Sequence, residues 1–173
     1  MPQETPLHTA VRLNKTREVQ DLIASGANLN ALDGMDLTPL MCACSGGKTL
    51  GSRIALLLIE AGADLNYVRQ GDDMTALMFA VHTGTPELIQ TLIHRGALVE
   101  GPPGTDQTPL MIAARAGHVE GLKVLVRNGA DIQRPCKLPW AGDRTAEGLA
   151  ELEKRKKAVE YLRGVRLGTI SPT

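Results

Sequence analysis

The residues Gly47-Lys48-Thr49 match the end of a phosphate-binding loop, in which backbone N–H groups and a lysine hold nucleotide phosphates. The complete motif needs another glycine five positions before its second glycine, and Cys42 occupies that position. The motif also has to follow a β-strand, whereas a helix is expected here. Residues 45–51, from Ser45 to Gly51, are therefore interpreted as an inter-helix loop. A nucleotide-binding or enzymatic role for this loop is kept as an alternative.

Zinc sites and nucleophile–base pairs are most often built from cysteine and histidine. The chain has few of these residues, and they are dispersed along the sequence. Cys42, Cys44 and Cys136 lack the paired spacing of a zinc site and form no disulfide framework. We expect Cys42 and Cys44 to be small buried residues, with a reactive or metal-binding role as the alternative. None of the four histidines has a cysteine or aspartate at a spacing typical of catalysis. The sequence therefore predicts no catalytic residue, no metal, no cofactor and no small-molecule substrate.

The basic run Lys154-Arg155-Lys156-Lys157 is the best candidate for contact with phosphate groups. Glu151, Glu153 and Glu160 are interleaved with it, and opposite charges at helical spacing are typical of a solvated helix face. No aromatic stacking platform accompanies the run. Nucleic acid is therefore not an expected partner.

Threonines recur along the chain at a nearly constant spacing, and each opens a similar segment. They are Thr5, Thr38, Thr75 and Thr108, with a weaker fifth at Thr145, so the spacings are 33, 37, 33 and 37 residues. The first four segments each reach a Gly-Ala pair, at Gly26-Ala27, Gly62-Ala63, Gly96-Ala97 and Gly129-Ala130. A period of this length is typical of repeat proteins and decides the architecture.

Each repeat is expected to contain two helices. A threonine can cap a helix through its hydroxyl, and proline is favoured at the first helical position. In the fourth repeat the pattern predicts a first helix that ends at Gly117 and a second from Val119 to Arg127. The second helices of the first and fifth repeats are expected at about residues 17–25 and 155–163. Such helices cannot bury their apolar faces alone, so neighbouring pairs must stack.

The signature T-P-L-H-x-A, which is typical of ankyrin repeats, is matched in full by residues 5–10. Residues 38–43 and 108–113 match it with Met for His, and residues 75–80 also lack the Pro. The chain therefore resembles the ankyrin repeat family over most of its length. The resemblance implies an all-α solenoid of stacked helix-turn-helix units with hairpin-like finger loops. It predicts one domain at 1–167, with repeats at about 1–33, 34–70, 71–103, 104–140 and 141–167, and a flexible tail at 168–173.

Composition agrees with a thin stack of helices. The 173 residues are 43% hydrophobic but only 2% aromatic, so the core must consist of aliphatic side chains. Net charge is zero, yet residues 1–109 hold 7 basic and 12 acidic side chains and residues 110–173 hold 12 and 7. This charge separation can steer a partner. Without an apolar run long enough to span a bilayer or a signal segment, a cytoplasmic protein with no membrane partner is expected.

The two ends of the stack are expected to be polar. The position after the signature His is Thr9 in the first repeat but apolar in the later ones, which suits an outer face. In the fifth repeat Glu147 and Glu151 replace residues that are uncharged in the other copies. We interpret these positions as an N-terminal and a C-terminal cap.

The family resemblance implies that a partner contacts the finger tips and the exposed end of each first helix. The corresponding positions are Met35, Leu37, Asp72, Met74, Thr105, Gln107, Ala141 and Arg144 on fingers and Arg12, Ser45, His82, Thr83 and Arg115 on helices. Met35, Leu37 and Met74 are expected to form an exposed apolar column, as is typical of interaction surfaces. Trp140, the only tryptophan, lies in an enlarged finger. It either anchors the partner or folds back over the end of the core.

The favoured function is a protein–protein interaction module that binds another protein and is monomeric when free. One form is a stand-alone inhibitor, such as an immunity-type protein that blocks an enzyme, and the alternative form is an adaptor that bridges two proteins. The interface residues expected are Met35, Leu37, Asp72, Met74, His82, Thr105, Gln107, Arg115, Trp140 and Arg144. A rigid scaffold would let the partner dock with little loss of ordering entropy.

Overall fold

The computed structural model describes residues 4–46, 50–83 and 85–171, with the backbone alone at residues 50 and 51. These residues form ten helices and no β-strand. The helices are α1 (Pro6–Arg12), α2 (Thr16–Ala24), α3 (Pro39–Ser45), α4 (Leu50–Glu60), α5 (Ala76–Thr83), α6 (Pro86–His94), α7 (Pro109–Ala116), α8 (Val119–Arg127), α9 (Ala146–Leu152) and α10 (Lys156–Arg166). The predicted all-α solenoid is confirmed.

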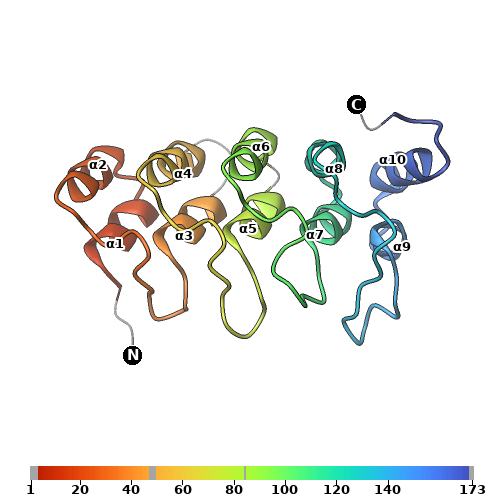
Figure 1. Ribbon diagram of the computed structural model, residues 1–173, viewed down its shortest axis with the longest axis horizontal. Helices are drawn as coiled ribbons and strands as arrows, with labels where there is room; N and C mark the ends of the chain where they lie inside the picture. Colours follow the sequence, from red (N-terminus) through yellow and green to blue (C-terminus); the bar gives the residue numbers. More distant parts are fainter. Residues whose placement is uncertain (1–3, 47–49, 84, 172–173) are drawn as a thin grey trace.

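The helices stand in two rows, as Figure 1 shows. Odd-numbered helices form one row and even-numbered helices the other, and loops project beyond the odd-numbered row. We call these loops the fingers: residues 25–38, 61–75, 95–108 and 128–145 join each even-numbered helix to the next odd-numbered one. The arrangement places all four fingers on the same side of the stack.

Threonine caps start most of the odd-numbered helices, as the sequence predicts. The side-chain oxygen accepts a hydrogen bond from the backbone N–H three residues further on, at 3.2 to 3.4 Å, in Thr5, Thr38, Thr75 and Thr108. This bond satisfies a donor that the first turn of a helix leaves unpaired. Thr145, which opens the degenerate fifth repeat, makes no such bond.

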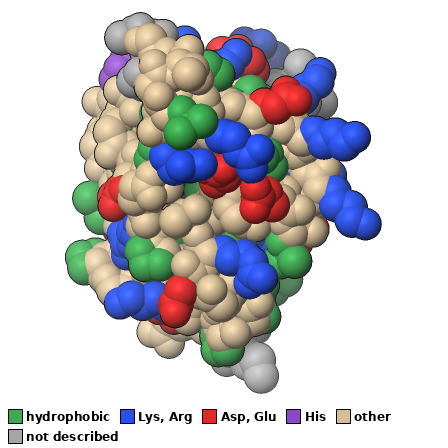
Figure 2. All heavy atoms as spheres, turned by 90° about the vertical axis from the view of Figure 1, so that its right-hand side faces the viewer, with side chains coloured by type: hydrophobic (Ala, Val, Ile, Leu, Met, Phe, Trp, Pro, Cys, Tyr) green, Lys and Arg blue, Asp and Glu red, His purple; other side chains and the backbone are tan. Residues whose placement is uncertain are grey.

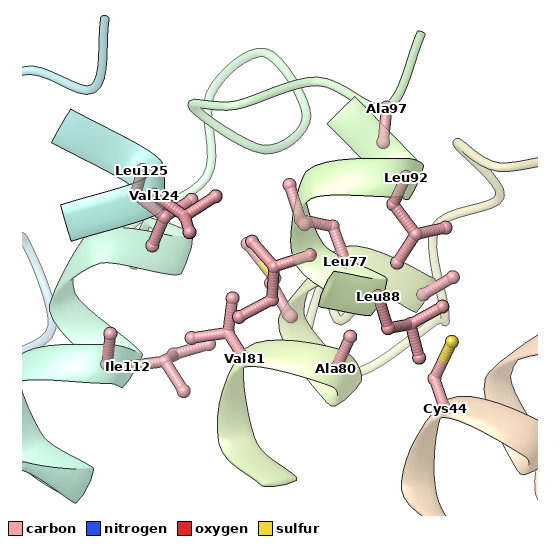
Figure 3. Close-up of a cluster of buried hydrophobic side chains, with 14 of the residues drawn as sticks. Cys44, Leu77, Ala80, Val81, Leu88, Leu92, Ala97, Ile112, Val124 and Leu125 are labelled. Atoms are coloured by element: carbon pink, nitrogen blue, oxygen red, sulfur yellow. The ribbon is translucent and has the colours of Figure 1, made fainter. Parts of the chain in front are cut away.

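The core is a continuous strip of mainly aliphatic side chains. They pack between the two rows of helices and between neighbouring helices of each row. In Figure 3, Cys44 of α3, Ala80 and Val81 of α5 and Ile112 of α7 follow one another across the odd-numbered row, with Leu92 of α6 on the other side. All five side chains are buried. Each helix pair therefore supplies the apolar surface that its neighbours need, as expected of a stack held by nearest-neighbour contacts.

The ends of the stack are polar, as predicted. Thr9 on α1 is exposed, whereas its equivalent Leu149 on α9 is buried against the preceding repeat. On the outer side of α9, Glu147 accepts hydrogen bonds from Arg163 at 2.9 Å and Arg166 at 2.8 Å. The carboxylate is thus covered by the arginines of α10.

Helix bounds follow the local signals closely. Helix α8 has the predicted bounds, and α2 begins and ends one residue before its prediction. Helix α10 continues three residues beyond the expected end, because the chain turns only at Gly168. In the region predicted as a tail, the N–H groups of Thr169 and Ile170 donate to the Gly164 carbonyl at 2.9 and 3.1 Å. A Cβ at Gly164 would lie 2.4 Å from the end of the Ile170 side chain, so a larger residue at this position would require Ile170 to move.

The Gly47-Lys48-Thr49 motif lies outside the described residues. On its two sides α3 ends at Ser45 and α4 begins at Leu50. Cys42, at the position where a phosphate-binding loop needs glycine, is a buried residue inside α3. The helical context differs from the strand that such a loop follows.

Candidate functional site

The fingers are held to one another by hydrogen bonds between repeats. The Asn30 side-chain oxygen accepts from the Asp64 N–H at 2.8 Å, and Asn66 accepts from the Leu98 N–H at 3.0 Å. Glu100 continues the series by accepting from the Asp131 N–H at 2.8 Å. Each bond ties the base of one finger to the backbone of the next, so the fingers form a connected surface.

A further bridge joins the tips of the first two fingers. Tyr67 donates its hydroxyl to Asp36 Oδ1 at 2.8 Å, and the Gln70 N–H donates to Asp36 Oδ2 at 2.8 Å. Asp36 has a positive φ of 58°, a conformation that aspartate tolerates better than most residues. Both carboxylate oxygens of Asp36 thus accept hydrogen bonds from the second finger, and this side chain bridges the two fingers.

In the first finger, Met35 and Leu37 face opposite environments. Met35 is 59% exposed, as predicted, but Leu37 is only 8% exposed, so its expected place in an apolar column is wrong. The cause is Asp33, whose Oδ1 accepts from the N–H groups of both residues at 2.8 and 3.0 Å. Its backbone N–H also donates to the Leu37 carbonyl. This tight turn directs Leu37 into the core.

In the second finger, Met74 is half-buried and packs against the core, so it too falls short of the exposed column expected. Asp72 is exposed and forms a bidentate pair with Arg69, in which Nε donates to Oδ1 at 2.8 Å. The hydrogen bonds from Arg69 lower the pKa of Asp72. Arg69 also lies 5.2 Å from the centre of the Phe79 ring, which fixes its orientation.

Two other predicted finger residues are buried. Thr105 is 5% exposed because its hydroxyl donates to the Gln107 carbonyl and its own carbonyl accepts from Arg134. Gln107 is half-buried. Ala141 is fully buried in the fourth finger, where its N–H donates to the Leu138 carbonyl at 2.8 Å. Thr105 and Ala141 shape the fingers from within and offer little surface to a partner, whereas Gln107 remains partly accessible.

The odd-numbered helices end in a row of polar residues beside the fingers. Arg12, Ser45 and His82 are exposed and Thr83 is half-buried. Arg12 forms ion pairs with Glu4 and Asp33. The His82 carbonyl accepts from His118 Nε2 at 2.9 Å, a bond that joins α5 to the start of α8. The row lies where the sequence predicts an interaction surface.

Trp140 is half-exposed on the surface and is not buried over the end of the core, while its role as an anchor for the partner stays a prediction. It is 48% exposed, and the guanidinium carbon of Arg115 lies 4.5 Å from its ring centre. Arg144, in the same finger, is exposed and donates from Nη1 to the Ala141 carbonyl at 2.6 Å. The buried positions of this enlarged finger are taken by Ala141 and Cys136 instead.

Two residues beside this pair were missed by sequence reasoning. Arg115 Nε lies 3.8 Å from Glu153 Oε1, and Arg155 Nε donates to the Arg115 carbonyl at 2.9 Å. Glu153 and Arg155 lie in the turn between α9 and α10, where the sequence predicted no contact residue. Their signal was the charged run itself, which we interpreted as a solvated face.

Three potential metal ligands meet between the first two repeats: ligand atoms of His8, Asp33 and Cys42 lie within 4.8 Å of one another. Both ring nitrogens of His8 are hydrogen-bonded, and the Arg12 guanidinium contacts both Asp33 and Cys42. A metal ion would have to displace this cation. Burial also raises the pKa of Cys42, which disfavours the thiolate that binds metals. The cluster is therefore best understood as a structural link between repeats.

The C-terminal end of the stack carries many charges of both signs. Figure 2 shows this end, with lysine and arginine side chains projecting from the surface and acidic side chains among them. Residues 154–157 are exposed, and Arg163 pairs with both Glu147 and Glu151. Apart from Arg155, which donates to the Arg115 carbonyl, the charges agree with the solvated, ion-paired surface that the sequence predicts.

A protein-family model described as Ankyrin repeats (3 copies) matches residues 2–69 and 49–136. The matches cover well over half of the sequence, so the chain belongs to the ankyrin-repeat family. Ankyrin repeats are generally protein–protein interaction modules, and the family is typically non-enzymatic.

Curated relatives share the repeats but are much longer. B-cell lymphoma 3 protein from Homo sapiens is 36% identical over 99 residues, which are 57% of this chain and 22% of that protein. Glycerophosphocholine phosphodiesterase gde1 from Schizosaccharomyces pombe is 37% identical over 99 residues, 57% of this chain and 8% of the relative. Neurogenic locus notch homolog protein 4 from Homo sapiens is 31% identical over 90 residues, 52% of this chain and 4% of the relative. The chain thus spans less than a quarter of the length of these relatives.

None of the helices in the described part of the chain combines the length and apolar character required to cross a bilayer.

Proposed function

We propose that this chain binds a partner protein across the fingers and the adjoining ends of the odd-numbered helices. The observation that carries the proposal is the combination of fingers cross-linked by hydrogen bonds with large apolar side chains exposed on them, Met35 and Trp140. A surface ordered in advance loses little conformational entropy on binding. Exposed apolar and aromatic residues supply contact area, and tryptophan is enriched among residues that dominate binding energy.

The proposed contact residues are those of the predicted set that remain accessible: Met35, Asp72, His82, Gln107, Arg115, Trp140 and Arg144. Leu37, Met74 and Thr105 support this surface from beneath. A cytoplasmic location and a monomeric state when free belong to the same proposal. The three cysteines are buried and unpaired, which fits a reducing compartment.

The proposal includes two modes of action that one assay separates. A stand-alone inhibitor, including an immunity-type protein, covers the active cleft of its partner and abolishes that partner's activity. An adaptor binds two proteins at once and leaves them active. Measuring the partner's activity at saturating concentrations of the chain distinguishes the two.

The binding proposal is tested on a partner captured from the native source and identified by mass. We expect Met35→Asp and Trp140→Ala each to weaken binding of this partner by about tenfold or more, since hot-spot truncations lose upwards of about 2 kcal/mol. Leu167→Asp is the matched control, because Leu167 is 61% exposed but lies at the end of α10 in the even-numbered row. Equal affinity of all three variants and wild type would refute this surface.

A further inference from the structure

A shallow pocket of about 230 Å³ lies at the C-terminal end of the proposed binding surface. It is formed where the ends of α5 and α7 meet the turn between α9 and α10, and it is lined by His82, Ile112, Arg115, Ala116, Glu153 and Arg155. Two arginines and a histidine thus face one carboxylate. Trp140 adjoins the pocket through its contact with Arg115.

The hydrogen-bonding capacity of Arg115 is incompletely used. Its Nε is buried and has no hydrogen-bond partner among the described residues. Glu153 Oε1, the nearest carboxylate oxygen, lies 3.8 Å from it, which is too long for a hydrogen bond. A buried donor without a partner is unfavourable, so an added acceptor at this edge would be bound with a gain in free energy.

The orientation of Arg115 is fixed from two sides. The guanidinium carbon of Arg115 lies over the Trp140 ring, 4.5 Å from its centre, in a cation–π contact. Arg155 donates to the Arg115 backbone carbonyl, and its side chain passes over Gly117, where a Cβ would come within 3.0 Å. Gly117 has φ of 76°, so glycine satisfies both the turn and the close approach. These contacts hold the Arg115 side chain and its backbone at the edge of the pocket.

The net charge of the C-terminal part of the chain favours binding of an acidic segment. Residues 110–173 carry a net charge of +5, from 12 basic and 7 acidic side chains. Within the pocket the cationic groups outnumber Glu153, and Arg144 is exposed on the neighbouring finger. An acidic segment is therefore attracted to this end of the stack by its positive charge, and the planar Arg115 guanidinium can then donate hydrogen bonds to a carboxylate.

We infer that this pocket receives an aspartate or glutamate side chain from an acidic segment of the partner protein, with Arg115 as the donor and Trp140 as the apolar wall beside it. The inference rests on the proposed protein-binding function and specifies the chemistry of the partner. A nucleic acid is disfavoured because a carboxylate of the chain, that of Glu153, already lines the pocket. The incoming carboxylate takes the place of Glu153 beside Arg115.

The inference is tested by selecting short random peptides, displayed on phage, against the full chain. We expect the selected peptides to be enriched in aspartate and glutamate, and their affinity to fall as salt is raised. Arg115→Ala should weaken these synthetic peptides by about tenfold or more, the typical effect of losing a charged hydrogen bond. Arg115→Lys should give an intermediate loss, because it keeps the charge but not the planar fork. Arg95→Ala, an exposed arginine at the end of α6, is the matched control and should leave affinity unchanged.

The outcomes separate this inference from the proposed function. Peptides that are not acidic, or that bind Arg115→Ala as well as wild type, overturn the acidic-segment inference while the binding surface stands. Selection of no peptide also counts against the inference, and capture of the native partner then decides the proposed function independently. A single-stranded RNA probe that binds in an Arg115-dependent manner where acidic peptides do not would replace the inference with nucleic-acid binding. Circular dichroism of each variant establishes that it is folded.

Discussion

Replacing Trp140 with alanine tests how the fourth finger is held against the stack. Truncation of a fully buried aromatic residue to alanine destabilises a protein by about 3–5 kcal/mol. Trp140 retains 48% of its exposure, so about half of that loss, roughly 2 kcal/mol, is expected. About 0.5–1 kcal/mol of it should belong to the cation–π contact with Arg115. For a chain of this length the melting temperature should fall by about 4–8 °C.

The assay is urea denaturation followed by far-ultraviolet circular dichroism. Fluorescence is unsuitable because Trp140 is the only tryptophan and the variant loses the signal. A double-mutant cycle with Arg115→Ala isolates the contact, and a coupling of about 0.5–1 kcal/mol is expected. A loss above about 3 kcal/mol would place the ring in the core, and a coupling of zero would remove the reason for treating the two residues as one unit.

Three further predictions concern the scaffold. Leu92→Ala, at a fully buried position in α6, should reduce the free energy of unfolding by about 2–5 kcal/mol in urea denaturation, and a loss below about 1 kcal/mol would contradict a continuous core. Thr108→Ala should lose about 1 kcal/mol with its helix cap, whereas Thr145→Ala, which lacks the cap bond, should lose much less; equal losses would show that the hydroxyl bond is not the cause. The third prediction concerns pH, because hydrogen bonds from Arg166 and Arg163 lower the pKa of Glu147. The resulting stabilisation is fully present above the unfolded-state pKa of about 4.3 and is lost as pH falls through the lower folded-state value. The stability difference between wild type and Glu147→Gln, measured by urea denaturation across the acid range, should therefore shrink as pH falls, and a constant difference would refute the linkage.

Much of the fold could be predicted from the sequence because its signals are local. A threonine cap and proline act within one turn of the helix they start, and the Asn128-Gly129 turn ends α8 where the pattern places it. The period of the repeats then requires stacking, since neither helix of a pair can bury its apolar face alone. The candidate site was harder to predict. Met35 is exposed as predicted, and Trp140 is exposed as in one of its two alternatives. Leu37 is buried instead of exposed, and the sequence did not predict a contribution of Glu153 and Arg155 to the site.

What the sequence determined by itself is the repeat architecture, the approximate helix bounds and the polar character of both ends of the stack. These depend on interactions between residues a few positions apart and on a period that is visible without coordinates. The exposure of each finger side chain was decided only by the tertiary structure, because it depends on bonds made across repeats or within a folded turn. Asp33 draws Leu37 inward through its bonds to the finger backbone. Arg115 contacts the Trp140 ring from a helix in the same repeat, while Arg155, 40 residues further along the chain than Arg115, lines the pocket from the next repeat.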